Sequence, residues 1–307
     1  MKESSGIMLG LISYFATSLM VFSNIDSSKP LAPAPNKGPL IINIGAPQQA
    51  TVLDDYLQTH GLEWPLLQTE IPALVVRALP RDMADIKSSK EKKSLFIRTL
   101  LPIVLLENHR LAEQRQRLIH FVRQTNSITE EQKYWLGNLL KHYRLTGDIN
   151  DIQLQKQLLL RLDQLPPSLV LAQAAIESGW GTSRFAQQGN SLFGQWSYQK
   201  NSGLVPDARN EGANHMVRAF DSLQESVQAY MRNLNTHGAY KELRLMRSSM
   251  RNKEQALDSN ALAHGLIRYS QRGEAYVEEV KTIIRGNKFT QYDQMELSQV
   301  VVQSKAD

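Results

Sequence analysis

One short segment constrains the fold more than any other part of this 307-residue chain. Residues 165 to 181 read LPPSLVLAQAAIESGWG, with Pro166 and Pro167 near the start and Gly179 and Gly181 at the end. Proline is favoured in the first turn of a helix, and glycine just after the last. A helix that is apolar nearly all round has to be buried on every side. The segment therefore predicts a short central helix around which other elements pack.

A carboxylic acid, Glu177, lies near the end of this predicted helix. Burial disfavours the charged form of a carboxyl and raises its pKa, and the negative end of the helix dipole acts in the same direction. Cleavage of a glycosidic bond requires a protonated acid, because the leaving oxygen must receive a proton. Glu177 is therefore a candidate general acid. The alternative is a Glu that caps or pairs locally, which is the commoner case for a lone Glu.

Aromatic side chains are concentrated directly after the helix: Trp180, Phe185, Phe193, Trp196 and Tyr198. Pyranose rings pack well on such side chains, and the amides of Asn190 and Gln195 are suited to hydrogen-bond acetamido groups. The pattern favours a saccharide site that includes Trp196, with core packing of the aromatic rings as the alternative.

The run AQAAIESGWGTSRFAQQGNSLFG resembles the signature of the glucosaminidase family, the mannosyl-glycoprotein endo-beta-N-acetylglucosaminidase-like enzymes. The signature is an alanine-rich helix ending in Glu-Ser-Gly-Trp-Gly, followed by an Asn-x-Leu-Phe-Gly turn. The runs FDSLQESVQAYMRNLN and YSQRGEAYVEEV are similar to two further family segments. The resemblance implies a mainly α (α+β) fold: a lysozyme-like domain with a small β-hairpin lobe, preceded by a helical N-terminal region.

The resemblance also implies roles for particular residues. The family's catalytic acid falls on Glu177. Its substrate-binding aromatic and turn residues fall on Trp180, Asn190, Phe193, Gly194 and Tyr269. Tyr269 begins Tyr-Ser-Gln-Arg-Gly, where the family has Tyr-Ala-Thr-Asp-Pro.

The second catalytic group is an acidic residue that the family places in its β-hairpin lobe. Asp207 and Glu211 are the candidates, and Glu211 is preferred because it directly precedes Gly212 and a strand-like run. Glu225 is nearby in sequence, but it has a structural role in a predicted capping box. In one mechanism Glu211 activates water and inverts the sugar configuration. In the other, the substrate's acetamido oxygen attacks and retains it.

The chain divides into five predicted parts. Residues 1–25 contain the uncharged run 7–23 and are interpreted as a signal peptide or membrane anchor, with a buried helix as the alternative. Residues 26–38 form a linker, 39–164 a mixed and then helical N-terminal region, 165–290 the catalytic domain and 291–307 a C-terminal tail.

Local patterns predict several elements. The runs LIINI and ALVVRAL between residues 39 and 80 indicate strands. Residues 84–165 have helical periodicity, in which Pro102 predicts a break or kink and Ser127 begins a capping box. Further helices are expected after Ser222 and over residues 274–285.

Composition and absent motifs narrow the function. The chain has no cysteine and a net charge of only +5, and its seven His are dispersed. It has no His-Glu-x-x-His, Gly-x-Ser-x-Gly, P-loop or dinucleotide fingerprint. We expect no cofactor, no metal and no nucleic-acid partner. The expected partner is the glycan strand of peptidoglycan, with membrane contact only through the N-terminal apolar segment.

The sequence as a whole favours an exported enzyme, periplasmic or anchored in the inner membrane, that cleaves β-1,4 bonds of N-acetylglucosamine in cell-wall glycan. Two alternatives stay open. One is a muramidase or lytic transglycosylase, which also uses one Glu at a helix end. The other is a non-catalytic protein that binds peptidoglycan.

Overall fold

The computed structural model describes residues 38–123, 128–197, 199, 202–206 and 216–298. The predicted signal peptide or anchor, most of the predicted linker, Asp207 and Glu211 lie outside the described residues, as does the end of the tail from residue 299. Within the described ranges no helix is long and apolar enough to cross a membrane. The mainly helical α+β class expected from the sequence is confirmed.

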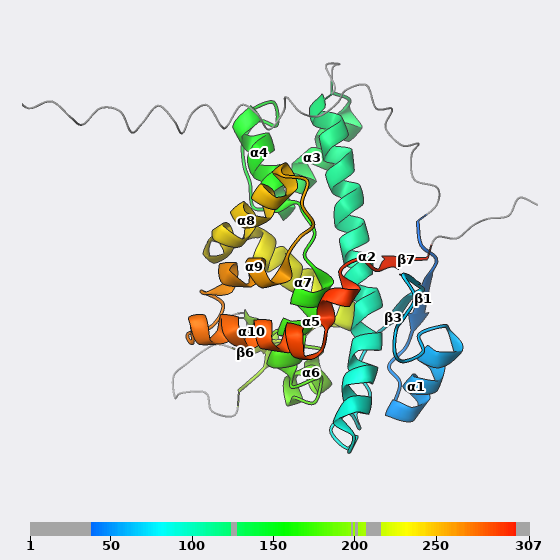
Figure 1. Cartoon of the computed structure of the whole chain (residues 1–307). Coiled ribbons are helices and arrows are strands. Elements are labelled where there is room, and N and C mark those ends of the chain that lie inside the picture. The colour runs from blue at the N-terminus through cyan, green and yellow to red at the C-terminus, as the bar shows by residue number, and fades with distance from the viewer. Residues whose placement is uncertain (1–37, 124–127, 198, 200–201, 207–215, 299–307) are drawn as a thin grey trace, which may run out of the picture.

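The longest helix, α2 (Ser89–Arg123), runs through the whole molecule (Figure 1). It packs against α1 and β3 on one side and against α5 and α7 on the other. Every residue from Ser94 to Asn108 is buried. This stretch contains Pro102, where the sequence predicts a break or kink, yet the helix continues without interruption. Proline inside a helix costs about 3 kcal/mol, and packing on all sides of α2 offsets that cost.

The N-terminal region forms a small parallel sheet beside α2. Strands β1 (Ile41–Ile44) and β3 (Ala73–Val76) lie at the two runs from which the sequence predicts strands. They pair in parallel. They are joined through α1 (Ala50–Thr59), a helix that the sequence reading missed although Ala50, Leu53 and Leu57 recur on one face and are buried. A second parallel pair joins β2 (Glu70–Ile71) to β7 (Glu296–Leu297), so the end of the chain returns to this region.

Two helices follow α2. Helix α3 (Glu130–His142) begins with a capping box formed by Thr129 and Gln132, whereas Ser127, where the sequence predicts the capping box, lies outside the described residues. The side chain of Thr129 accepts from the backbone N–H of Gln132, and the Gln132 side chain accepts from the backbone N–H of Thr129. Helix α4 is Ile152–Arg161.

The central helix predicted from the sequence is α5 (Pro167–Ser178). Proline occupies its first turn, and Gly179 ends it with φ +57°, a left-handed conformation that glycine adopts without strain. Ten of its residues are buried, which places α5 in the core. The predicted apolar helix is confirmed in its limits and in its burial.

The remaining elements surround α5. A small sheet of order β4-β6-β5 forms the β lobe, with both pairs antiparallel. Its strands are Trp196–Ser197, Gly203–Leu204 and Met216–Arg218 for β4, β5 and β6. The helices are α6 (Arg184–Gly189), α7 (Leu223–Thr236), α8 (Lys241–Asn252), α9 (Ser259–Ala263) and α10 (Glu274–Gly286). Short 3-10 turns occupy Gly238–Tyr240, His264–Leu266 and Phe289–Tyr292.

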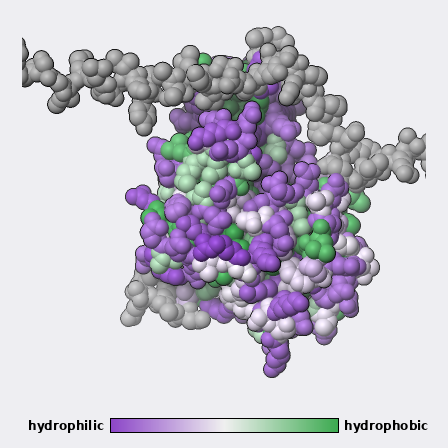
Figure 2. All heavy atoms as spheres, in the orientation of Figure 1, coloured by the Kyte–Doolittle hydropathy of each residue, from purple (hydrophilic) through white to green (hydrophobic). Residues whose placement is uncertain are grey.

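One hydrophobic core extends from Ala50 to Leu297 and includes side chains of α2, α5, α7 and α10. The visible surface of the described residues is largely hydrophilic, with smaller hydrophobic areas between the hydrophilic ones (Figure 2). The N-terminal region and the helices around α5 therefore share a single packed interior.

The segment before α5 is fixed by a buried carboxylate, Asp163. Its oxygens lie 3.6 Å from Arg247, 3.1 Å from Arg251 and 3.9 Å from Arg115. Burial acts to raise the pKa of Asp163, but the three guanidinium groups outweigh it, and the pKa is lowered. Asp163 is therefore charged, and it ties α2 and α8 to the start of α5.

Candidate active site

Glu177 lies at the end of α5 and is half-buried. Its Oε1 accepts a hydrogen bond of 2.7 Å from the hydroxyl of Tyr276 on α10. That hydroxyl accepts from Nε2 of Gln173 at 2.9 Å, and Oε1 of Gln173 accepts from Tyr230 on α7. Three helices therefore contribute to one chain of hydrogen bonds that ends on the carboxyl of Glu177.

The two oxygens of the Glu177 carboxyl have different surroundings. Among the described residues the carboxyl accepts one hydrogen bond, at Oε1. Oε2 lies beside Gly194, 3.6 Å from the point that a Cβ on that residue would occupy. Gly194 has φ +59°, which favours glycine. Oε2 is thus the oxygen available to carry a proton to a ligand.

Burial raises the pKa of Glu177, and the negative charge of Glu279 acts in the same direction. The hydrogen bond from Tyr276 and the charge of Arg272 oppose the shift without cancelling it. Arg272 is itself paired with Glu279 at 2.6 Å. The carboxyl therefore keeps its proton to a higher pH than an exposed Glu, in the direction that burial at a helix end predicts.

Two of the predicted substrate-binding residues stack on the tyrosines of this chain of hydrogen bonds. The ring of Phe193 stacks on Tyr230, with centroids 3.9 Å apart, and Tyr269 stacks on Tyr276 at 5.3 Å. The Tyr269 hydroxyl donates to the backbone oxygen of Phe193 at 2.9 Å. The structure thus brings Phe193, Tyr269 and Gly194 together around Glu177.

Trp180 and Asn190 make contacts with the protein itself. The ring of Trp180 lies edge-on to Phe96 at 5.7 Å and to Phe289 at 6.1 Å, and Lys93 is 4.6 Å from its centroid. Asn190 ends α6 and donates its side-chain N–H to the backbone oxygen of Phe220 at 3.0 Å. These contacts hold the segment between α5 and the β lobe. Substrate binding by either residue stays a prediction.

The other predicted site residues are more distant or lie outside the described part. Trp196 is 59% exposed on β4. Glu211, the predicted second catalytic group, is not among the described residues. Ser222 accepts from the backbone N–H of Glu225, as the predicted capping box requires, but the Glu225 side chain accepts from the backbone N–H of Asp221 instead of that of Ser222. Among the described residues no group of His, Asp and Glu has the geometry to hold a metal ion.

Sequence reasoning did not assign Gln173, Tyr230 and Tyr276 to the site. A signal for Gln173 was present, since it is the polar residue within an apolar helix, one turn before Glu177. Tyr276 belongs to the run 269–280 that resembles the family, but the resemblance matches the family's site tyrosine to Tyr269 instead. The hydroxyl that reaches Glu177 is that of Tyr276.

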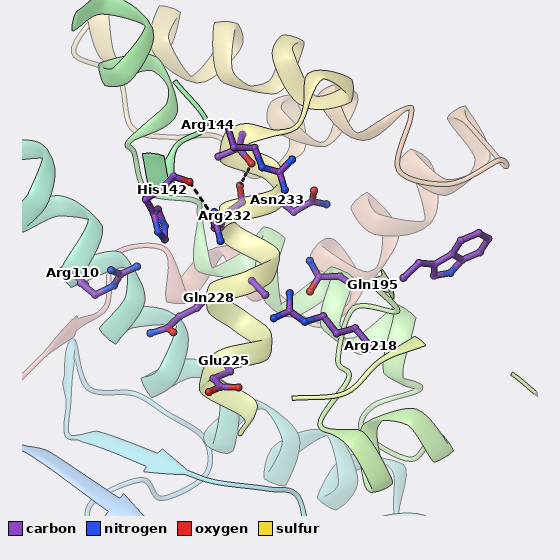
Figure 3. A pocket seen from close by; sticks show the side chains of 12 residues that line it. Arg110, His142, Arg144, Gln195, Arg218, Glu225, Gln228, Arg232 and Asn233 are labelled. Atoms are coloured by element: carbon purple, nitrogen blue, oxygen red, sulfur yellow. Dashed lines mark hydrogen bonds between the residues drawn. The ribbon is translucent and has the colours of Figure 1, made fainter. Parts of the chain in front are cut away.

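A pocket of about 550 Å³ lies next to this site, over the exposed face of α7 (Figure 3). Glu177 is not among the residues that line it, but Gln195, the residue after Gly194, is. We call this hollow the α7 pocket. Its lining residues are Arg110, His142, Arg144, Gln195, Trp196, Arg218, Glu225, Gln228, Ala229, Arg232, Asn233 and Thr236.

A half-buried carboxyl with a raised pKa has the property that glycoside hydrolases require of their general acid. Residues 155–289 match the family described as mannosyl-glycoprotein endo-beta-N-acetylglucosaminidase. The chain belongs to this glucosaminidase family, and the family predicted from the sequence is confirmed.

Two curated proteins are similar to the chain. Protein bax of Escherichia coli is 33% identical over 196 residues, which cover 64% of this chain and 69% of that protein. Exo-glucosaminidase LytG of Bacillus subtilis is 26% identical over 159 residues, covering 48% of this chain and 50% of its own length. Among solved structures, the catalytic domain of the autolysin Auto from Listeria monocytogenes matches 59% of this chain and 97% of its own, with 20% identity and a TM-score of 0.32.

Proposed function

We propose that the chain is a peptidoglycan hydrolase that cleaves β-1,4 bonds of N-acetylglucosamine in cell-wall glycan, with Glu177 as its general acid. The observation that carries the proposal is the half-buried carboxyl at the end of α5, which Tyr276 orients at 2.7 Å and whose pKa burial raises. The description of the family and the name of the relative LytG support the choice of N-acetylglucosaminyl bonds.

The contacts of Glu177 suit a general acid. Oε2 carries the proton and delivers it to the glycosidic oxygen as the bond to the anomeric carbon breaks. Negative charge then develops on the carboxyl, and the Tyr276 hydroxyl, 2.7 Å from Oε1, stabilises that charge. Gln173 holds Tyr276 in place at 2.9 Å. The hydrogen bond is therefore stronger in the transition state than before it.

For the second catalytic group we propose the same two alternatives as the sequence does. Either Glu211 activates a water molecule, or the acetamido oxygen of the substrate attacks the anomeric carbon. Trp180, Asn190 and Trp196 are proposed to contact the sugars, and residues 165–290 to carry the chemistry. We propose export through the N-terminal segment, because the substrate lies outside the cytoplasm.

Mass spectrometry of a peptidoglycan digest tests the proposal. Reducing N-acetylglucosamine ends are the expected product. Reducing muramic acid ends would indicate a muramidase, and anhydro-muramic ends a lytic transglycosylase, and either result would overturn the bond assignment. A digest without new ends, from folded protein that still binds the sacculus, would assign the chain to the non-catalytic class.

A further inference from the structure

The α7 pocket has a regular construction. Its floor is one stripe of α7, at the spacing of successive helical turns: Glu225, Gln228, Ala229, Arg232, Asn233 and Thr236. The opposite stripe, which includes Tyr230 and Leu234, is buried in the core. Figure 3 shows Arg110 and His142 on one side of the helix and Gln195 and Arg218 on the other. The pocket is therefore a trough with α2 and the end of α3 on one side and the β lobe on the other.

The charge of the trough is strongly positive. It is lined by four arginines, Arg110, Arg144, Arg218 and Arg232, and by one carboxylate. Arg110 is neutralised by Glu107, with Nε 2.9 Å from Oε2. Among the described residues no carboxylate lies within ion-pair distance of the other three arginines. Within the described part of the chain, three guanidinium groups thus face a single exposed carboxylate in the lining, that of Glu225.

The pKa of His142, which lines the same side of the trough as Arg110, is consistent with the positive charge of the trough. Its pKa is lowered to about 4, first by burial and then by the charges of Arg232 and Arg110. A neutral imidazole adds no charge of its own to the trough.

Neutral groups hold two of the three guanidinium groups in place. Arg232 donates from Nε to the backbone oxygen of His142 at 3.1 Å, and the guanidinium of Arg218 lies 4.6 Å from the ring centroid of Phe220. The backbone of Arg144 is held after α3 in a left-handed turn with φ +55°, where its backbone oxygen accepts from Arg161 at 3.1 Å. The contacts of Arg232 and Arg218 fix position without cancelling charge. Guanidinium groups held in this way are prepared for a planar anion such as a carboxylate.

The trough joins the site of Glu177 at two points. Gln195 follows Gly194, which lies against Oε2 of Glu177. Asn233 is a hydrogen-bond partner of Tyr240, whose ring lies 6.1 Å from that of Tyr269. The lining of the trough therefore begins one residue from the glycine beside Oε2 of Glu177.

We propose that the α7 pocket binds the free carboxylates of the peptide carried by the glycan strand next to the bond that is cut. This inference rests on the proposed function. Peptidoglycan alternates N-acetylglucosamine with a lactyl sugar, and the peptide on that lactyl group ends in carboxylates. The peptide is thus attached to the sugar next to the cleaved N-acetylglucosamine. Its negative charge is complementary to the positive charge of the trough.

The test compares two substrates that differ only in the peptide: soluble peptidoglycan strands, and the same strands freed of peptide by an amidase. The double variant Arg144→Gln/Arg232→Gln is expected to lower kcat/KM on peptide-bearing strands by about tenfold. Its rate on peptide-free strands should stay within about twofold of the wild type. The single variants Arg144→Gln and Arg218→Gln, which leave the Arg232 contact to α3 in place, should show smaller losses of the same kind.

The control variant is Arg81→Gln, which removes an exposed arginine outside the trough and should change neither rate. Equal losses on both substrates, or no loss on either, would overturn the inference while leaving the proposed function intact. A wild-type protein that cuts neither substrate would instead refute the proposed function.

A binding measurement keeps the inference testable without turnover. A disaccharide-peptide should bind the wild type about tenfold more tightly than the same disaccharide without peptide, and the double variant should lose that difference. Equal affinity for the two ligands would overturn the inference. Tighter binding of polyphosphate than of the disaccharide-peptide would also overturn it and would assign the trough to a phosphate polymer.

Discussion

Two acidic side chains near opposite ends of α5 are both withdrawn from water, yet their pKa values move in opposite directions. Asp163, before the first turn, is enclosed by three guanidinium groups that lower its pKa in spite of burial. Glu177, in the last turn, is surrounded by tyrosines, and burial raises its pKa. Burial is common to both, so the chemistry of the neighbouring groups decides which acid keeps its proton.

The comparison separates two uses of a buried acid. A carboxylate paired with Arg115, Arg247 and Arg251 links three parts of the chain but has no proton to give. A carboxyl with one tyrosine hydroxyl on Oε1 and a raised pKa keeps its proton to a higher pH, and it has a partner for the charge that forms when the proton leaves. Structural and chemical roles are thus assigned by neighbours from other helices.

The largest expected effect is on activity. Glu177→Gln should lower the rate of glycan cleavage by about 10²–10⁴-fold, because general acid catalysis contributes this much. Release of reducing ends from purified peptidoglycan measures it. The variant should fold normally, since the amide still accepts from Tyr276, and the exposed control Glu242→Gln should retain full activity. Wild-type rates in Glu177→Gln would contradict the assignment.

The next effect is on stability. Asp163→Asn should lower the free energy of unfolding by about 3–5 kcal/mol, because it leaves the fully buried Arg247 without its counter-charge. Urea denaturation at neutral pH measures the change, while activity per folded molecule should stay the same.

The pH dependence sharpens this prediction. The pKa of Asp163 is lowered in the folded state, so its contribution to stability is present above the unfolded pKa and is lost as the pH falls through the folded one. The gap between wild type and Asp163→Asn should therefore narrow in acid. A gap that is constant with pH would show that the charge of Asp163 is not what stabilises the fold.

A smaller effect is expected at the partner of Glu177. Tyr276→Phe removes the hydrogen bond that favours the charged carboxyl. The pKa of Glu177 should rise further, and the limb of the kcat profile that falls with increasing pH should move to higher pH. Turnover should drop about tenfold, because a hydrogen bond to a charged group contributes about 1.5 kcal/mol or more. Tyr134→Phe, at an exposed position, is the matched control.

The smallest expected effect is a shift of the pH profile in the opposite direction to that of Tyr276→Phe. Glu279→Gln removes a negative charge that raises the pKa of Glu177 and frees Arg272, whose charge lowers it. The falling limb should move to lower pH, by less than Tyr276→Phe moves it upward, because Glu279 is partly exposed and screened. The shift should shrink as salt is added. A limb that moves to higher pH would show that Glu279 does not act through its charge.

Local signals in the sequence were enough to predict α5 and the strands β1 and β3. Pro167 and Gly179 mark the ends of α5, and the residues between them are apolar. Such features act over one or two turns of chain. The same reasoning fails at Pro102, because the burial of α2 on all sides depends on elements far away in sequence.

Only part of the site was predictable, because sequence signals act over short distances along the chain. Glu177 has a signal within its own helix, but its partners Tyr276 and Tyr230 come from α10 and α7, and only the packing of these helices brings them together. The cluster at Asp163 is a further example. Arg115 is separated from Asp163 by almost fifty residues of sequence, yet it lies beside Asp163 and donates to the backbone oxygen of Leu162 at 2.8 Å.

The length of α2 has a consequence for any attempt to produce the site on its own. Residues 155–289 match the family model, but α2, which starts at Ser89, packs against α5 and α7 from outside that stretch. A fragment that starts at residue 155 would contain Glu177, Tyr230 and Tyr276 without the helix against which α5 and α7 pack. Such a fragment is expected to leave apolar side chains of both helices uncovered.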